Sequence, residues 1–228
     1  YGEYNQDTHE AHVRDLKGLL TVTRWISAIQ RSEIQGDFSA VSELLEAHPA
    51  AAHLAEASFL ENIHRNAEAR RPLKKARELI EQNPLHGPAA LFEPVLRERI
   101  AWIDADRLYQ RQAAQAFHAL DRHDYLRATL YGFEAYLTRK AQEAEHIKPG
   151  RESHYEERQR LRERLEANRA FRQSPEGNAY LNLRNLRNAL AHGTTQKVQD
   201  IQQALSSPEA LHSAVGSALE TLLGDCKE

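Results

Sequence analysis

Residues 183–193 read LRNLRNALAHG and predict an amphipathic helix that ends at a glycine. Leu183, Leu186 and Leu190 recur at positions i, i+3 and i+7, which is the spacing of a buried helical stripe. Glycine readily takes the left-handed conformation that follows a last helical turn, so Gly193 is the expected stop. We therefore expect a helix over residues 178–192 that packs its leucines into a helical core.

The polar residues of this helix fall on a face of their own. At about 100° per residue, Arg184, Asn188 and His192 point away from the leucine stripe, and Arg187 lies at the border between the two faces. His192 is at the C-terminal end, where the helix dipole favours a positive charge. Two arginines and a histidine suit phosphodiester chemistry, which needs cations to hold the phosphate and a group that moves protons.

The charge around this helix is unbalanced. Residues 177–199 contain Arg184, Arg187, His192 and Lys197 but no acidic residue, although acids outnumber bases 33 to 30 in the whole chain. An exposed helix selected for stability would carry glutamates one turn from its cations. Two interpretations are open, a solvated polar face and an anion-binding site, and the missing acids favour the second.

Length and composition indicate a soluble globular protein. The chain has 228 residues, 41% of them hydrophobic and 28% charged, and no apolar run is long enough to span a bilayer. A single cysteine, Cys226, cannot form an internal disulfide, which predicts a reducing, cytoplasmic location. The absence of methionine in a chain that opens with Tyr1 predicts a fragment or a processed product.

The net charge of −3 excludes a strongly basic protein that coats nucleic acid, so any RNA contact must be local or assembled from several subunits. Residues 70–77 contain a basic cluster, and we interpret it as a solvated helix face, which is the usual role of charged helical positions. Its members are Arg70, Arg71, Lys74, Lys75 and Arg77. No cofactor loop and no metal site is predicted, since His9 and His12 lie three residues apart without further ligands.

Helical spacing extends over almost the whole chain, so the predicted fold class is all-α, with no convincing strand. In the first helix we expect Leu20, Ile26 and Ile29 to face inward, and in the helix from Tyr125 we expect Phe133 and Tyr136 to do so. The predicted helices cover residues 8–35, 38–48, 49–70, 72–82, 91–120, 125–145, 152–172, 178–192, 195–205 and 208–223.

The strongest linker signal is the stretch from Asn83 to Pro88, which contains two prolines and a glycine. We place a domain boundary there. Residues 1–88 then form an N-terminal helical region or connector, and residues 89–228 form the helical bundle that carries the polar helix.

The run from Arg187 to His192 resembles the R-x(4–6)-H motif of the HEPN superfamily, in which a polar residue directly follows the arginine. HEPN proteins are helical "higher eukaryotes and prokaryotes nucleotide-binding" domains, many of them metal-independent ribonucleases. The helix pair over residues 116–137 is similar to the region before the motif in CRISPR-associated effectors that join a CARF sensor to a HEPN domain. The resemblance covers roughly residues 91–223.

The resemblance implies an endoribonuclease that needs no metal or cofactor. In such a site the RNA 2′-hydroxyl attacks the adjacent phosphorus, and the products are a 2′,3′-cyclic phosphate and a 5′-hydroxyl. Arg187 would hold the phosphate, His192 would move the proton and Asn188 would orient either group. Arg184 and Lys197 would bind neighbouring phosphates of the single-stranded RNA. Because one helix offers one histidine, the family pairs two motif helices across a homodimer.

The resemblance also implies a regulator, the cyclic oligoadenylate that binds a CARF sensor, but no βαβ pattern of such a sensor is present in this sequence. Two possibilities stay open: a sensor outside this chain, or a stand-alone HEPN toxin in antiviral defence. The alternative from another class is a non-catalytic helical module whose polar helix binds a partner or a second copy.

Overall fold

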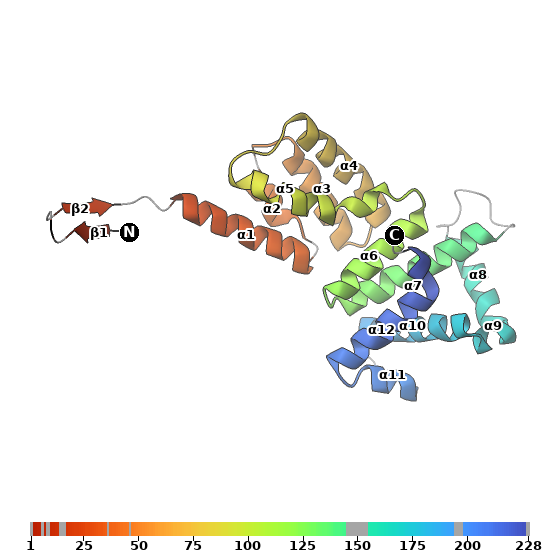
Figure 1. Ribbon diagram of the computed structural model, residues 1–228. Coiled ribbons are helices and arrows are strands. Elements are labelled where there is room, and N and C mark those ends of the chain that lie inside the picture. The colour runs from red at the N-terminus through yellow and green to blue at the C-terminus, as the bar shows by residue number, and fades with distance from the viewer. Residues whose placement is uncertain are drawn as a thin grey trace. The chain divides into compact units, whose positions relative to one another are not determined.

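The computed structural model describes residues 2–5, 7, 10–13, 17–35, 37–45, 47–144, 155–193 and 198–226. The described residues are predominantly helical, which confirms the all-α class (Figure 1). Two compact units divide the chain, residues 1–103 and residues 104–228. This division falls within the helix that we predicted over residues 91–120, and the linker at Asn83–Pro88, where we placed the boundary, lies inside unit 1.

Unit 1 begins with a short antiparallel hairpin that we did not predict. Strands β1 (Gly2–Asn5) and β2 (Glu10–Val13) pair Gly2 with Val13 and Asn5 with Glu10. The predicted start of the first helix at Thr8 is therefore wrong, and helix α1 runs over Lys17–Gln35. Asp7 lies in a turn between the two strands, and Asp favours turns over helix interiors.

Helix α1 buries only part of the face that we predicted, with Ile29 inward as expected. Trp25, Ala28 and Ile29 are buried, whereas Leu20 and Ile26 are 63% and 43% exposed. The buried residues lie in the C-terminal half of the helix, which packs on α2 (Ser39–Leu44) and α5 (Pro88–Arg99). Hydrophobic spacing alone identified the helix but not which of its apolar residues meets a neighbour.

The next two helices of unit 1 form a helical hairpin, and the chain turns between them at a different residue from the one that we predicted. Helix α3 spans Ala50–Asn62 and α4 spans Asn66–Gln82, so Pro72 lies inside α4 and not at its start. The chain turns instead at His64, whose φ is 60°. After α5, a short 3₁₀ helix η1 (Ala101–Asp104) interrupts the long helix that we predicted over residues 91–120.

Unit 2 is a helical bundle arranged around α7 (Tyr125–Glu143), which contacts α6, α8, α10 and α12. Its helices follow the predicted order, although the predicted helix over residues 152–172 breaks at Asn168 into α8 and α9. The other elements are α6 (Leu108–Asp121), α8 (Tyr155–Ala167), α9 (Arg169–Gln173), α10 (Pro175–His192), α11 (Gln199–Ala204), α12 (Pro208–Leu223) and η2 (Gly224–Cys226).

The core of unit 2 contains the predicted inner faces of α7 and α10. Phe133 and Tyr136 of α7 are each 1% exposed, and Leu183 and Leu186 of α10 are fully buried. The rings of Phe133 and Tyr180 stack with centroids 5.3 Å apart, which joins the two helices through aromatic contact. Among the described residues, no helix is both long and apolar enough to cross a membrane.

Candidate functional site

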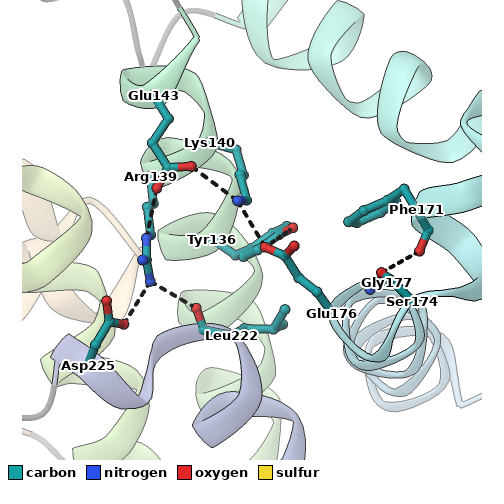
Figure 2. Close-up of polar contacts among 10 residues, drawn as sticks. All are labelled: Tyr136, Arg139, Lys140, Glu143, Phe171, Ser174, Glu176, Gly177, Leu222 and Asp225. Atoms are coloured by element: carbon teal, nitrogen blue, oxygen red, sulfur yellow. Dashed lines mark hydrogen bonds and ion pairs between the residues drawn. The ribbon is translucent and has the colours of Figure 1, made fainter.

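Helix α10 begins at a tightly held turn. Ser174 is its N-cap: its hydroxyl accepts a hydrogen bond from the Gly177 amide at 3.0 Å and donates one to the Phe171 carbonyl at 2.7 Å (Figure 2). This cap satisfies an amide that has no partner inside the helix. The turn fixes where α10 starts relative to α9.

Charged groups of α7 hold the same end of α10. Glu176 pairs with Lys140 at 2.9 Å and accepts a hydrogen bond from the Tyr136 hydroxyl at 3.0 Å (Figure 2). The neighbouring residue of α7, Arg139, pairs with Asp225 at 2.7 Å, just beyond the C-terminal end of α12. These contacts hold the start of α10 and the end of α12 against α7, and they fix the position of the helix that carries the polar face.

The other end of α10 is as the sequence predicts. The helix ends at His192, and Gly193 takes the left-handed conformation with φ 60° and ψ 22°. His192 is exposed, as is expected for a side chain in the last turn of a helix that leaves the core. An exposed imidazole at this position can reach a bound molecule.

The two arginines of the motif differ in their partners. Arg184 donates from Nη1 to the carboxylate of Glu166 in α8 at 2.7 Å. The expectation that the positive charge of this helix is uncompensated is therefore wrong for Arg184. The compensating acid comes from another helix, whereas the sequence argument counted only residues 177–199.

Arg187 has no carboxylate partner among the residues that the structure describes, and it lies against an aromatic ring. Its guanidinium carbon is 4.3 Å from the centroid of the Phe133 ring, a cation–π contact with a buried side chain. Its Nε and Nη2 donate to Asn188 Oδ1 at 3.3 and 2.9 Å. The ring and the amide together fix the plane of the guanidinium.

The electrostatic surroundings of Arg187 favour a bound anion. Burial lowers the pKa of its guanidinium; the carboxylate of Glu134 acts in the opposite direction and the cation of Arg162 adds to the decrease. Glu134 itself is paired with Arg158. A half-buried cation with neighbouring cations and without a carboxylate of its own is stabilised by a phosphate, since arginine stays charged at all relevant pH.

The structure brings together part of the predicted site. Arg184, Arg187 and Asn188 lie within two turns of α10, and His192 follows one turn later at the end of the helix. Asn188 hydrogen-bonds to Arg187, and in the described residues no hydrogen bond joins it to His192. Lys197, predicted to bind phosphate, lies outside the described residues.

Sequence reasoning missed two residues that hold the arginines. Phe133 was predicted only as a core residue of α7, and Glu166 was one of several glutamates in a helix of alternating charge. No spacing signal links either to α10, because both contacts join separate helices. Glu166 also accepts a hydrogen bond from the Tyr180 hydroxyl at 3.0 Å, so it has two partners on α10.

Replacement of Glu166 by glutamine should weaken the packing of α8 on α10 in a manner that depends on pH. Burial opposes ionisation of this carboxyl. The hydrogen bonds from Arg184 and Tyr180 and the positive charge of Arg184 outweigh burial and hold its pKa below the ordinary 4.5. A lowered pKa stabilises the fold above pH 4.5, and this contribution is lost as pH falls through the folded value. We expect Glu166→Gln to cost about 1–2 kcal/mol at pH 7 and less near pH 3, where protonation of the carboxyl reduces this contribution.

Hydrogen exchange of the α8 and α10 amides at the two pH values measures this difference, after correction for intrinsic exchange rates. Glu163→Gln is the matched control: Glu163 is exposed on the same helix, and among the described residues it accepts a hydrogen bond from Gln159 alone, at 2.8 Å. An equal effect of both substitutions at pH 7 would show that Glu166 makes no specific contribution to the packing of α8 on α10.

Comparisons with known proteins give no further assignment. No family model, no curated protein and no solved structure gives a significant match to this chain. In the described residues there is also no group of three or more histidine, cysteine, aspartate or glutamate side chains arranged to hold a metal ion.

Proposed function

We propose that the chain is a metal-independent endoribonuclease that cleaves single-stranded RNA with Arg187 and His192. The observation that carries this proposal is the state of Arg187: a half-buried cation, held flat on Phe133, without a carboxylate partner in the described part of the chain. The run Arg187–His192, which resembles the HEPN motif, ends at an exposed histidine on the same helix. A fixed cation and an accessible imidazole are the groups that phosphodiester cleavage needs.

The RNA supplies its own nucleophile in this mechanism. His192 removes the proton of the 2′-hydroxyl or protonates the departing 5′-oxygen, and the 2′-oxygen forms a bond to phosphorus as the bond to the 5′-oxygen breaks. Arg187 donates hydrogen bonds to the non-bridging oxygens as their charge increases in the transition state. Asn188 keeps the Arg187 fork in the required plane, and Arg184 guides the neighbouring phosphate.

A homodimer would complete the site. Arg187 and His192 are five residues apart, which separates them by about 140° around the helix. One chain therefore directs them to different sides, and proton removal and proton donation need two groups. When two copies of α10 meet across a two-fold axis, the arginine of one and the histidine of the other can act on the same phosphate.

The biological setting follows only from the HEPN resemblance. It is RNA cleavage in CRISPR-linked antiviral defence in the cytoplasm, switched on by a cyclic oligoadenylate through a sensor domain outside this sequence, or the action of a stand-alone HEPN toxin. Both settings use the same chemistry on α10.

A single assay tests the ribonuclease proposal. The protein is incubated with end-labelled single-stranded RNA, with and without EDTA, and the product ends are analysed. We expect cleavage in both conditions, with 2′,3′-cyclic phosphate and 5′-hydroxyl ends that polynucleotide kinase can label without prior phosphatase treatment. Cleavage that EDTA abolishes, or products with 5′-phosphates, would overturn the proposed mechanism.

One observation favours the second candidate, a non-catalytic helical module. The ion pair of Arg184 with Glu166 and the stacking of Arg187 on Phe133 are also contacts that stabilise a bundle. This candidate expects no cleavage of RNA at any salt concentration. It also expects Arg187→Ala to weaken self-association or binding of a protein partner.

A further inference from the structure

The basic cluster of α4 lines an open groove in unit 1, on a helix that the proposed active site does not use. The groove has a volume of about 810 Å³, and His53 and Glu56 of α3 form its other wall. Helices α3 and α4 lie side by side in unit 1 (Figure 1). The sequence alone favours an ordinary solvated face for these cations, whereas the structure shows that four of them line the same groove.

Four cations face this groove from one side of α4. Arg70 and Lys74 are half-buried, and Arg71 and Lys75 are exposed. The opposite side of α4 is packed in the core, with Ala69, Leu73, Ala76 and Ile80 all buried. The cations therefore form two layers along the helix, Arg70 with Arg71 and Lys74 with Lys75.

Acidic groups balance only part of this charge. Lys75 pairs with Glu78 at 3.3 Å, and Glu56 lies 3.9 Å from His53. Arg71 and Lys74 have no ion pair with any residue that the structure describes. With four cations and two carboxylates in its lining, the groove has a net charge of +2 when His53 is neutral.

This arrangement opposes the stability of α4. Arg70 with Lys74, and Arg71 with Lys75, are like charges at i,i+4, and each such pair costs about 0.2–0.5 kcal/mol in a helix. A helix selected for stability alone would alternate the sign of these positions. Departures from local stability rules concentrate at functional sites, so the groove is a candidate for binding an anion.

We propose that the α3–α4 groove binds the phosphate backbone of single-stranded RNA without regard to base sequence. The two cation layers are about 6 Å apart along α4, from a rise of 1.5 Å per residue, which is close to the spacing of successive phosphates in an extended strand. Apart from the imidazole of His53, no aromatic side chain of the described residues lines the groove, so it offers little surface for base stacking. Phosphate contacts of this kind give affinity and position but no sequence preference.

Binding of labelled RNA in the full chain tests the groove, with His192→Ala present in every protein so that cleavage cannot interfere. A fluorescent oligouridylate is titrated at several salt concentrations and its anisotropy is measured. We expect Arg71→Ala with Lys74→Ala to weaken binding about tenfold at low salt. The slope of log K against log salt should fall by about 1.4, since each phosphate contact to a single strand contributes about 0.7.

Two double variants serve as controls. Arg71→Lys with Lys74→Arg keeps both charges and should bind almost as the parent does. Arg24→Ala with Arg65→Ala removes two exposed cations elsewhere in unit 1 and should change the affinity and the slope much less. Circular dichroism shows that each variant is folded.

The outcomes separate this inference from the proposed ribonuclease activity. If the alanine pair in the groove binds RNA with the parent affinity and slope, the groove inference is wrong, whether or not the unmodified chain cleaves RNA. Binding of a fluorescent poly-glutamate that depends on Arg71 and Lys74, in a chain that does not bind RNA, would assign the groove to an acidic protein and also overturn the inference. RNA binding that depends on the groove, in a chain without cleavage activity, would support the groove inference and contradict the proposed ribonuclease activity.

Discussion

The His192→Ala variant should cleave single-stranded RNA about 10³-fold more slowly than the unmodified chain. His192 is the exposed terminal residue of α10, so its removal leaves the leucine core of the helix untouched. Proton transfer would then depend on water alone. The measurement is the single-turnover rate of cleavage of an end-labelled RNA at saturating protein.

The Arg187→Ala variant should lose about as much, and Arg187→Lys should lose about 10²-fold. Lysine keeps the charge but lacks the planar fork that Phe133 and Asn188 hold in place. A partial loss with lysine would therefore separate the geometry of the guanidinium from its charge. Light scattering of both variants reports whether they keep the oligomeric state of the parent.

His86→Ala is the matched control for histidine removal, because His86 is exposed in the loop between α4 and α5 of unit 1. Its rate should equal that of the parent. If His192→Ala and Arg187→Ala both retain the parent rate, the cleavage site is elsewhere. If the rates fall only because the dimer dissociates, the polar helix serves as an interface and the second candidate function gains support.

Local sequence signals predicted most helices of unit 2, although they missed the break between α8 and α9 at Asn168. The leucine spacing located the buried face of α10, and Gly193 marked its end because only a left-handed residue suits that position. The aromatic face of α7 followed from the same periodicity, with Phe133 buried as predicted. These features depend on neighbours within one helix, which a sequence displays directly.

Contacts between helices could not be predicted in the same way. The partner of Arg184 is Glu166, which lies on a helix with many equivalent glutamates. In unit 1, the apolar Leu20 has the spacing of a core residue and is nevertheless exposed. Pro72 has the signature of a helix start and lies inside α4. Each of these outcomes is decided by packing of one element on another, where tertiary contacts prevail over local preference.

The Gly177→Ala variant should destabilise unit 2 by about 3 kcal/mol, a large share of the stability of a domain of this size. Gly177 lies in the first turn of α10, where a Cβ would be 1.8 Å from the carbonyl oxygen of Phe171 and 2.6 Å from its carbonyl carbon. Both are backbone atoms, so no side-chain rotation can relieve the overlap. Either α9 must move away from α10 or the Ser174 cap must break.

The expected result is a melting temperature lower by about 10 °C, followed by circular dichroism. Hydrogen exchange should increase first in α9 and in the first turns of α10. Trp25 and Trp102 are both in unit 1, so their fluorescence serves as an internal reference for the unit without the substitution.

Gly216→Ala is the matched control, because Gly216 is inside α12 of the same unit and a Cβ there would meet only Leu120 Cδ2, at an ordinary 3.5 Å. Alanine is a better helix former than glycine, so this variant should be as stable as the parent or slightly more stable. Equal melting temperatures for the two variants would contradict the close approach of α9 to α10. A large loss at Gly177 alone would mean that the polar face of α10 owes its position to one backbone contact, and RNA cleavage by Gly177→Ala should then fail at temperatures where the parent is active.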